Sequence, residues 1–277
     1  MIWTTIWKKL KNIMKSSSEI EEICRKYGIE NYTINEDGSI DVNGSVDLEG
    51  KKLNRLPLEF NRVTGHFNCS RNMLRSLERS PKYVGSSFHC SSNKLTTLKG
   101  SPTIINGNFY CDDNDLTSLE YAPEYIKFSF SCNNNDLTSL EHSPKEILGS
   151  FYCHVNKLTT LKGCTENIPG YFNCSENNLT SLEYSPRFVG SSFYCKENEI
   201  RDLYGISDNI NGLLYCYDTP IGSIFNQVNM DFIRAFNSFR VIKDDKVHLK
   251  RLKYVMKIFD NKYYNLNDIK EYYTIYE

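Results

Sequence analysis

The sequence predicts a repeat solenoid, and three regularities lead to this prediction. Cysteines recur every 21 residues, a Phe stands two residues before nearly every one of them, and an Asn stands three residues after most of them. The cysteines of this column are Cys69, Cys90, Cys111, Cys132, Cys153, Cys174, Cys195 and Cys216. Columns held in one register over so many units indicate stacked identical coils rather than a globular core.

Each unit reads F-x-C-x-x-N-x-L-x-x-L-x-x-x-P-x-x-I/V-x-G-x. The F-x-C segment alternates inward and outward as a short strand does, so stacked units should form a parallel sheet on the concave side. The Asn should satisfy backbone groups of adjacent coils, and the Leu and Ile/Val columns should fill the interior. On the convex side we expect only short turns, set by the recurrent Pro. We predict about nine coils, from 44 to 225.

This unit resembles the leucine-rich-repeat pattern L-x-L-x-x-N-x-L, with Phe and Cys in the first two Leu places. More specifically, Gly149 to Leu161 (GSFYCHVNKLTTL) and Leu179 to Pro186 (LTSLEYSP) resemble repeats of leucine-rich-repeat proteins encoded by bacteriophages and some bacteria. The segment from Cys24 to Leu48 is similar to the one that precedes those repeats. The resemblance covers about 20 to 243. It implies a leucine-rich-repeat solenoid with a binding role and says little about the partner.

Helical caps are expected at both ends, because a solenoid exposes its core and sheet edges there. In 18–43, a capping box over Ser18–Glu21 should begin a short helix that ends at Gly28, followed by a hairpin of 32–34 and 40–42. In 226–277, three apolar stripes at helical spacing predict a C-terminal helical cap. A separate docking module is the alternative reading of this segment.

Residues 1–17 form a segment of different character. A stripe of apolar residues that includes Trp3 and Trp7 runs beside Lys8 and Lys9, which predicts a basic amphipathic helix. This helix could lie on a membrane surface or dock on a partner. The alternative is that it packs on the solenoid or on a second copy of the chain.

Catalytic, metal and cofactor chemistry finds no support in the motifs. The 21-residue spacing of the cysteines offers no C-x-x-C or Cys/His cluster, so we expect buried free thiols. The run Asp112–Asp115 lacks the Gly and Glu of a calcium loop. Glycine-rich phosphate loops are absent. We therefore expect neither an enzyme nor a resident metal or cofactor.

We expect the protein to be located in the cytoplasm. If the chain is encoded by a phage, this is the cytoplasm of the host cell. The sequence contains no stretch of about 18 apolar residues, the length that a helix needs to span a bilayer. The N-terminus also has no uninterrupted apolar region like that of a signal peptide. The net charge is −1, and few Lys or Arg fall on the expected concave positions, which argues against nucleic-acid binding.

The residues that flank Phe and Cys on each strand should line the concave face. Tyr recurs there among Ser and Asn, as in antibody-like binding surfaces. The predicted partner-binding residues are Tyr110, Tyr152, Tyr171, Tyr194, Tyr215, Tyr217, His89, His154, Asp112 and Glu197. The competing explanation is that strands simply favour Tyr.

Our leading hypothesis is a non-enzymatic scaffold that binds a protein on its concave face. The resemblance to phage proteins extends this hypothesis to a phage-encoded chain that captures or inhibits a host defence protein. Two other hypotheses stay open. One is a structural or virion-associated protein that self-assembles, and the other is recruitment to a membrane surface by residues 1–17. The sequence does not identify the partner, the host or the oligomeric state.

Overall fold

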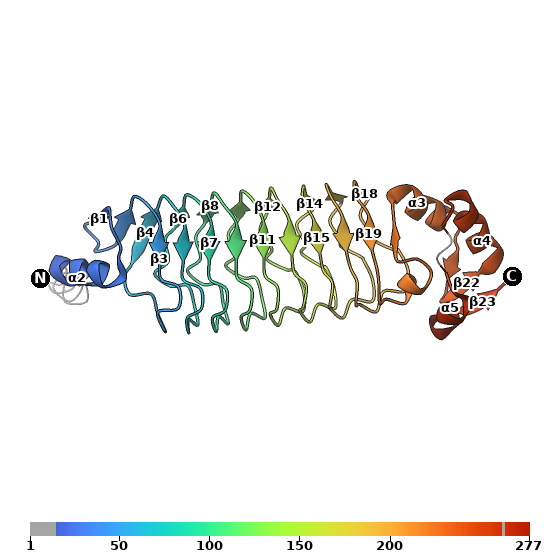
Figure 1. The fold of residues 1–277 in the computed structure, drawn as a ribbon, viewed down its shortest axis with the longest axis horizontal. Coiled ribbons are helices and arrows are strands. Elements are labelled where there is room, and N and C mark those ends of the chain that lie inside the picture. The colour runs from blue at the N-terminus through green and yellow to red at the C-terminus, as the bar shows by residue number, and fades with distance from the viewer. Residues whose placement is uncertain (1–14, 262–263) are drawn as a thin grey trace, which may run out of the picture.

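The computed structural model describes residues 15–261 and 264–277. Figure 1 shows a long rod in which stacked coils run between a short N-terminal helix and a C-terminal unit of helices and strands. The rod is a parallel β-solenoid of about eight turns. One continuous apolar core extends from Ile20 to Tyr273 through the middle of every coil. The prediction of a solenoid is confirmed.

The first sheet is built from the Phe of each repeat and the residue that follows it. Its nine parallel strands are β3 (Val46–Asp47), β5 (Phe67–Asn68), β7 (Phe88–His89), β9 (Phe109–Tyr110), β11 (Phe130–Ser131), β13 (Phe151–Tyr152), β15 (Phe172–Asn173), β17 (Phe193–Tyr194) and β19 (Leu214–Tyr215), and β20 (Gln227–Val228) closes it antiparallel to β19. Each Phe pairs with the Phe one coil away. In the view of Figure 1 this sheet runs straight along the rod.

A second row of parallel strands occupies the side where the sequence predicts only turns. It comprises β4 (Phe60–Val63), β6 (Tyr83–Val84), β8 (Ile104–Ile105), β10 (Tyr125–Ile126), β12 (Glu146–Ile147), β14 (Asn167–Ile168), β16 (Phe188–Val189) and β18 (Asn209–Ile210), which fall into two hydrogen-bonded groups, β4 to β12 and β14 to β18. The prediction of turns alone was wrong. Each of the two-residue strands from β6 to β18 buries a single Ile or Val, so the sequence contains no alternation by which these strands could be recognised.

The Phe column forms a stack of rings through the core. Neighbouring ring centroids lie 5.2 Å apart for Phe130 and Phe151 and 5.6 Å apart for Phe109 and Phe130. These rings are fully buried, as are the cysteines of the ladder. Aromatic contact of this geometry adds to the stabilisation from burial. The predicted inward positions of Phe and Cys are confirmed.

The Asn column joins each coil to the preceding one. The Asn135 side-chain amide donates to the carbonyls of Cys111, Cys132 and Asn133 at 3.1, 3.1 and 3.0 Å, and its oxygen accepts the Leu116 N–H at 3.0 Å. The same pattern recurs at the other Asn of the column, for example in the bond from Leu95 N–H to Asn114. The predicted role of this side chain is confirmed.

The N-terminal end follows the prediction with one shift of register. Helix α2 (Ser17–Tyr27) begins after Ser16, whose hydroxyl accepts the Glu19 N–H while the Glu19 carboxylate accepts the Ser16 N–H. The capping box is therefore Ser16–Glu19 and not Ser18–Glu21. Both pairs fit the S-x-x-E pattern, and the structure forms the earlier one. Gly28 ends the helix in a left-handed conformation.

A hairpin connects this helix to the coils, as predicted. Strands β1 (Tyr32–Ile34) and β2 (Ile40–Val42) pair antiparallel around a turn at Gly38. Strand β2 then pairs parallel with β4 and so extends the second sheet. The hairpin thereby joins the first coil through backbone hydrogen bonds, and Ile40 and Val42 are buried.

The C-terminal unit contains helices where the stripes predict them and a small sheet that they do not predict. A 3-10 turn η1 (Ile221–Ser223) leads to α3 (Met230–Ser238), α4 (Leu249–Ile258) and α5 (Leu266–Tyr272), while β21 (Ile242–Lys243), β22 (Lys246–His248) and β23 (Thr274–Tyr276) form a three-stranded sheet. The unit is fixed to the last coils at Arg201. The Tyr273 hydroxyl donates to the Arg201 carbonyl at 2.6 Å, and the Arg201 guanidinium donates to the Tyr272 carbonyl at 3.0 Å.

Candidate functional site

The outer face of the first sheet, here called the first-sheet surface, presents two side chains per coil. They are the residue between Phe and Cys and the residue after Cys. The burial pattern places the predicted residues Tyr110, Tyr152, Tyr194, Tyr215, Tyr217, His89, His154 and Asp112 on this surface, each of them half-buried. Tyr171 and Glu197 lie at its two edges and are exposed. The predicted set thus shares one side of the rod but divides into groups of different character.

Four tyrosines make one continuous group at the C-terminal end of the surface, which we call the tyrosine cluster: Tyr171, Tyr194, Tyr215 and Tyr217. The rings of Tyr194 and Tyr215 are stacked, with centroids 4.7 Å apart and planes 3° apart. Tyr171 lies 6.2 Å from Tyr194, and Tyr217 lies 6.0 Å from Tyr215. Strand register produces this order, because β17 and β19 place consecutive Tyr side by side.

Packing within the cluster limits the freedom of its rings while leaving their edges and hydroxyls accessible. Burial raises the pKa of Tyr194, so its hydroxyl stays protonated at neutral pH. The Tyr217 hydroxyl donates to the side-chain oxygen of Gln227 at 3.1 Å, which fixes the ring at the closing strand β20. Tyr171 remains 43% exposed. Rigid aromatic rings with polar tips lose little entropy on binding a partner.

A second aromatic group lies toward the N-terminal end. His89 stacks on Tyr110 with centroids 4.8 Å apart and planes 27° apart, and His66 lies 6.2 Å from His89. Burial lowers the pKa of His89, and the neighbouring His66 lowers it further, while Glu49 and Asp112 act in the opposite direction. His89 is therefore neutral at physiological pH and presents an uncharged ring.

Between the two aromatic groups the surface is polar and its side chains bond to one another. The Asp112 carboxylate accepts hydrogen bonds from the Ser131 hydroxyl and, at 3.0 Å, from the Asn133 N–H. The backbone N–H of His154 donates to the Asn133 side-chain oxygen at 3.1 Å. The ring nitrogen Nδ1 of His154 lies 3.3 Å from the side-chain amide nitrogen of Asn173. Asp112 and His154 thus connect neighbouring coils, which uses part of their capacity to bind a partner.

Tyr152 and Glu197 complete the predicted set. Ser131 and Asn173 occupy the positions beside Tyr152 in its column, so this ring is separated from the tyrosines of the other coils. Glu197 lies in the turn after its strand, and its carboxylate is 3.5 Å from the Lys196 ammonium. Lys196 also lies 3.7 Å from Glu176. Glu197 therefore belongs to an edge rather than to the sheet face.

Two exposed apolar side chains beside this surface were missed by sequence reasoning. Phe128 and Leu148 are 52% and 44% exposed and lie in the turns between second-sheet and first-sheet strands, as Tyr171 does. Gly149 stands one coil after Phe128, and a Cβ there would meet the Phe128 backbone at 2.7 Å. The available signal was the departure from column composition, because Phe128 stands where most units have Gly or Ser.

The cysteines, the most nucleophilic side chains of the described residues, lie mostly in the core. All ten cysteines are free thiols, and the eight of the ladder are fully buried. Burial raises the pKa of these thiols, that of Cys195 to about 12. Several donate to a carbonyl of the next coil, as Cys111 does to Ser131 at 3.3 Å. Across the described ranges, no group of three or more His, Cys, Asp or Glu is placed to hold a metal ion.

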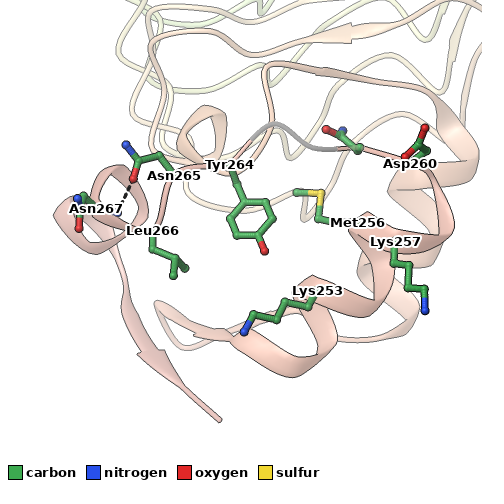
Figure 2. A pocket seen from close by; sticks show the side chains of 9 residues that line it. Lys253, Met256, Lys257, Asp260, Tyr264, Asn265, Leu266 and Asn267 are labelled. Carbon is green, nitrogen blue, oxygen red and sulfur yellow. Dashed lines mark hydrogen bonds between the residues drawn. The ribbon is translucent and has the colours of Figure 1, made fainter.

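An open hollow of about 800 Å³ lies in the C-terminal unit. Figure 2 shows Tyr264 in its middle, with Met256 and Lys253 of α4 on one side and Leu266 on the other. Asn265 accepts a hydrogen bond from the Asn267 N–H at 3.0 Å, which begins helix α5. None of the predicted binding residues line this hollow.

Residues Trp3, Trp7, Lys8 and Lys9 lie outside the described residues. The described part of the chain contains no helix with the length and apolar character needed to cross a bilayer. Comparison with models of known protein families gives no match, and neither does a search of curated proteins.

Proposed function

We propose that the chain is a non-enzymatic scaffold that binds a protein partner through its first-sheet surface. The tyrosine cluster carries this proposal. Its rings contact one another in a row from Tyr171 to Tyr217, and Tyr194 and Tyr215 stand on short strands of a hydrogen-bonded solenoid, so they are held in place before any partner arrives. Buried aromatic anchors on a rigid support dominate the free energy of protein interfaces.

The contact area should extend from the cluster around the edge of the sheet. Tyr171, Phe128 and Leu148 occupy different positions of the repeat, but all three lie exposed in turns that lead into first-sheet strands, and exposed large apolar side chains are typical of interaction sites. The polar stretch around Asp112 and His154 would then lie at the rim, where hydrogen bonds and water set orientation more than affinity. His89 and Tyr110 offer a second aromatic contact for a long partner.

We also propose that the coils are leucine-rich repeats of the short type and that the terminal helices act as caps. Asn side chains that bridge coils and the two Leu columns support the repeat type. Ile20 and Cys24 of α2 and Phe232 and Phe236 of α3 are buried at the two ends of the common core, which supports the role of these helices as caps. By the same resemblance, the partner would be a host protein met in the cytoplasm by a phage-encoded chain.

Affinity capture from a bacterial lysate, with bound proteins identified by mass spectrometry, tests the proposal. The test variant replaces Tyr171, Tyr194 and Tyr215 by Ala. Its matched control replaces three exposed tyrosines outside the first-sheet surface, Tyr121, Tyr184 and Tyr204, by Ala. We expect one protein to be retained by the native chain and the control and lost by the test variant. Equal retention by all three would refute the role of the cluster.

Self-assembly and membrane recruitment through residues 1–17 remain the alternative hypotheses. Flotation of the chain with anionic liposomes tests recruitment, and a chain that stays at the bottom of the gradient would end that hypothesis. Loss of the Trp3 and Trp7 side chains should abolish flotation if the hypothesis holds.

A further inference from the structure

Charge is divided unevenly along the rod, although the whole chain is nearly neutral. Residues 44–100 contain ten Lys and Arg against four Asp and Glu, whereas residues 101–225 contain seven against sixteen. The first coils are therefore positive and the later coils negative. Such a separation creates an electric field that favours particular arrangements of charged partners.

The division is clearest along one edge of the rod, which we call the turn edge. It consists of the second and fourth residues after the Cys of each coil, or after Leu48 in the first. The positive members come first, Lys52, Arg71 and Lys94, followed by the negative members Asp113, Asp115, Asp136, Glu176, Glu197, Glu199 and Asp218, among which Lys157 is the one positive residue. Side chains of adjacent coils share one continuous edge, since Asp113, Asp115 and Asp136 line a common hollow.

Most of these side chains are exposed and project from the rod. Arg71 has 74% of its side chain exposed although it lies 3.1 Å from Glu49, and Glu197 has 49% exposed although it lies 3.5 Å from Lys196. Among the residues that the structure describes, Lys94, Asp115 and Glu199 take part in no ion pair within 4.0 Å. The turn edge therefore has charge available for a partner.

When two copies of the turn edge run in opposite directions, each basic member of one copy faces an acidic member of the other. A twofold axis at the coil of Cys132 would place Arg71 opposite Glu197 of a second copy, Lys94 opposite Glu176, and Asp115 opposite Lys157. Lys52 would face Asp218. At the axis, Asp136 meets its own copy, but its carboxylate already lies 2.6 Å from Lys157 within each chain. Equal spacing of the coils keeps these pairs in register along the whole edge.

We propose that a second copy of this chain docks antiparallel along the turn edge and forms a twofold symmetric dimer. A symmetric dimer requires a surface that matches itself, and the order of charges along this edge meets that requirement. A nucleic acid carries one sign of charge along its length and would be repelled by the acidic coils. Exposed ion pairs are individually weak and are screened by salt, so the dimer should dissociate as salt is added.

Sedimentation velocity of the full chain at about 20 mM and about 500 mM salt tests the proposal. We expect a dimer at low salt and a monomer at high salt. Two variants, Arg71→Glu with Lys94→Glu and Glu176→Lys with Glu197→Lys, should each be monomeric at low salt, because like charges then face each other. Their mixture should form a heterodimer, and a chain carrying all four substitutions should dimerise again.

Recovery in the mixture also shows that both variants are folded. A native chain that is monomeric at low salt, or variants that dimerise as the native chain does, would overturn the proposal. Dimerisation can be distinguished from the proposed binding of a partner. Replacement of Tyr171, Tyr194 and Tyr215 by Ala should abolish partner binding and leave the dimer intact.

Discussion

Val155 illustrates how the solenoid constrains single residues. It lies in the turn after β13 with φ of 53°, and the equivalent residues of the other coils, from Arg71 to Asp218, are left-handed as well. Left-handed backbone is costly for a β-branched side chain and tolerated by Asn. Val155 is the one β-branched residue of this column, and 36% of it is exposed.

Replacement of Val155 by Asn should therefore stabilise the protein by about 1 kcal/mol, the lower end of the cost of such strain. Urea unfolding followed by circular dichroism measures the change. Val155→Thr keeps the branch at Cβ and serves as the control, for which we expect no gain. If the two variants have equal stability, the strain is absent.

The histidines of the first-sheet surface should make stability depend on pH. Burial lowers the pKa of His89 and of His154 below the ordinary value, so the unfolded chain binds protons more readily than the folded one. As the pH falls below about 6.5, where free His begins to protonate, the unfolded state gains protons and the free energy of unfolding decreases.

We expect the chain to unfold at lower urea concentration at about pH 5 than at about pH 7, and the variant His89→Gln, His154→Gln to lose part of this difference. His142, which is exposed, gives a matched control when replaced by Gln. An unchanged pH dependence in the double variant would assign the effect to other groups.

For single residues, the sequence predicted position and role wherever the same residue type recurs in successive repeats. The inward positions of Cys and Phe and the role of Asn follow from their columns. Asp112 and His154 were placed on the correct surface, but their bonds to Ser131 and Asn133 depend on which side chains meet across coils. Phe128 was overlooked because one departure from a column carries little weight beside the column itself.

The Asn ladder is the element that holds successive coils together. Asn135 satisfies three carbonyls and one N–H in the interior, where an unpaired polar group costs about 1–3 kcal/mol. Asn135→Ala should thus lower the free energy of unfolding by about 3 kcal/mol or more, measured by urea unfolding. Asn178→Ala removes an exposed amide and should have little effect. Similar losses in both would contradict the bridging role.

Helices and strands were predictable where a long pattern of apolar residues marks them in the sequence. The first sheet, the hairpin and the three C-terminal helices were anticipated from alternation and helical spacing. The second sheet escaped prediction because each of its two-residue strands, β6 to β18, shows only one buried residue. The strands β21 to β23 escaped prediction because each is only two or three residues long, and because β23, which follows the last helix, pairs with the distant β22.

At the scale of the whole molecule, the solenoid converts a repeated sequence into straight rows of side chains. One row gives the tyrosine cluster, a neighbouring row gives the turn edge, and the core beneath them is the same in every coil. Variation at outward positions therefore changes binding without changing the fold. This separation explains why fold could be inferred from the repeat, while the partner could not.

The central claim is that the tyrosine cluster binds a protein, and a binding isotherm of the captured protein tests it most directly. Calorimetric titration would compare the native chain, the control with Tyr121, Tyr184 and Tyr204 replaced, and the variant with Tyr171, Tyr194 and Tyr215 replaced by Ala. We predict equal affinity for the first two. For the third we predict a loss of more than about 100-fold, since an aromatic anchor contributes about 2 kcal/mol or more. An unchanged dissociation constant in a variant that unfolds at the native urea concentration would contradict the claim.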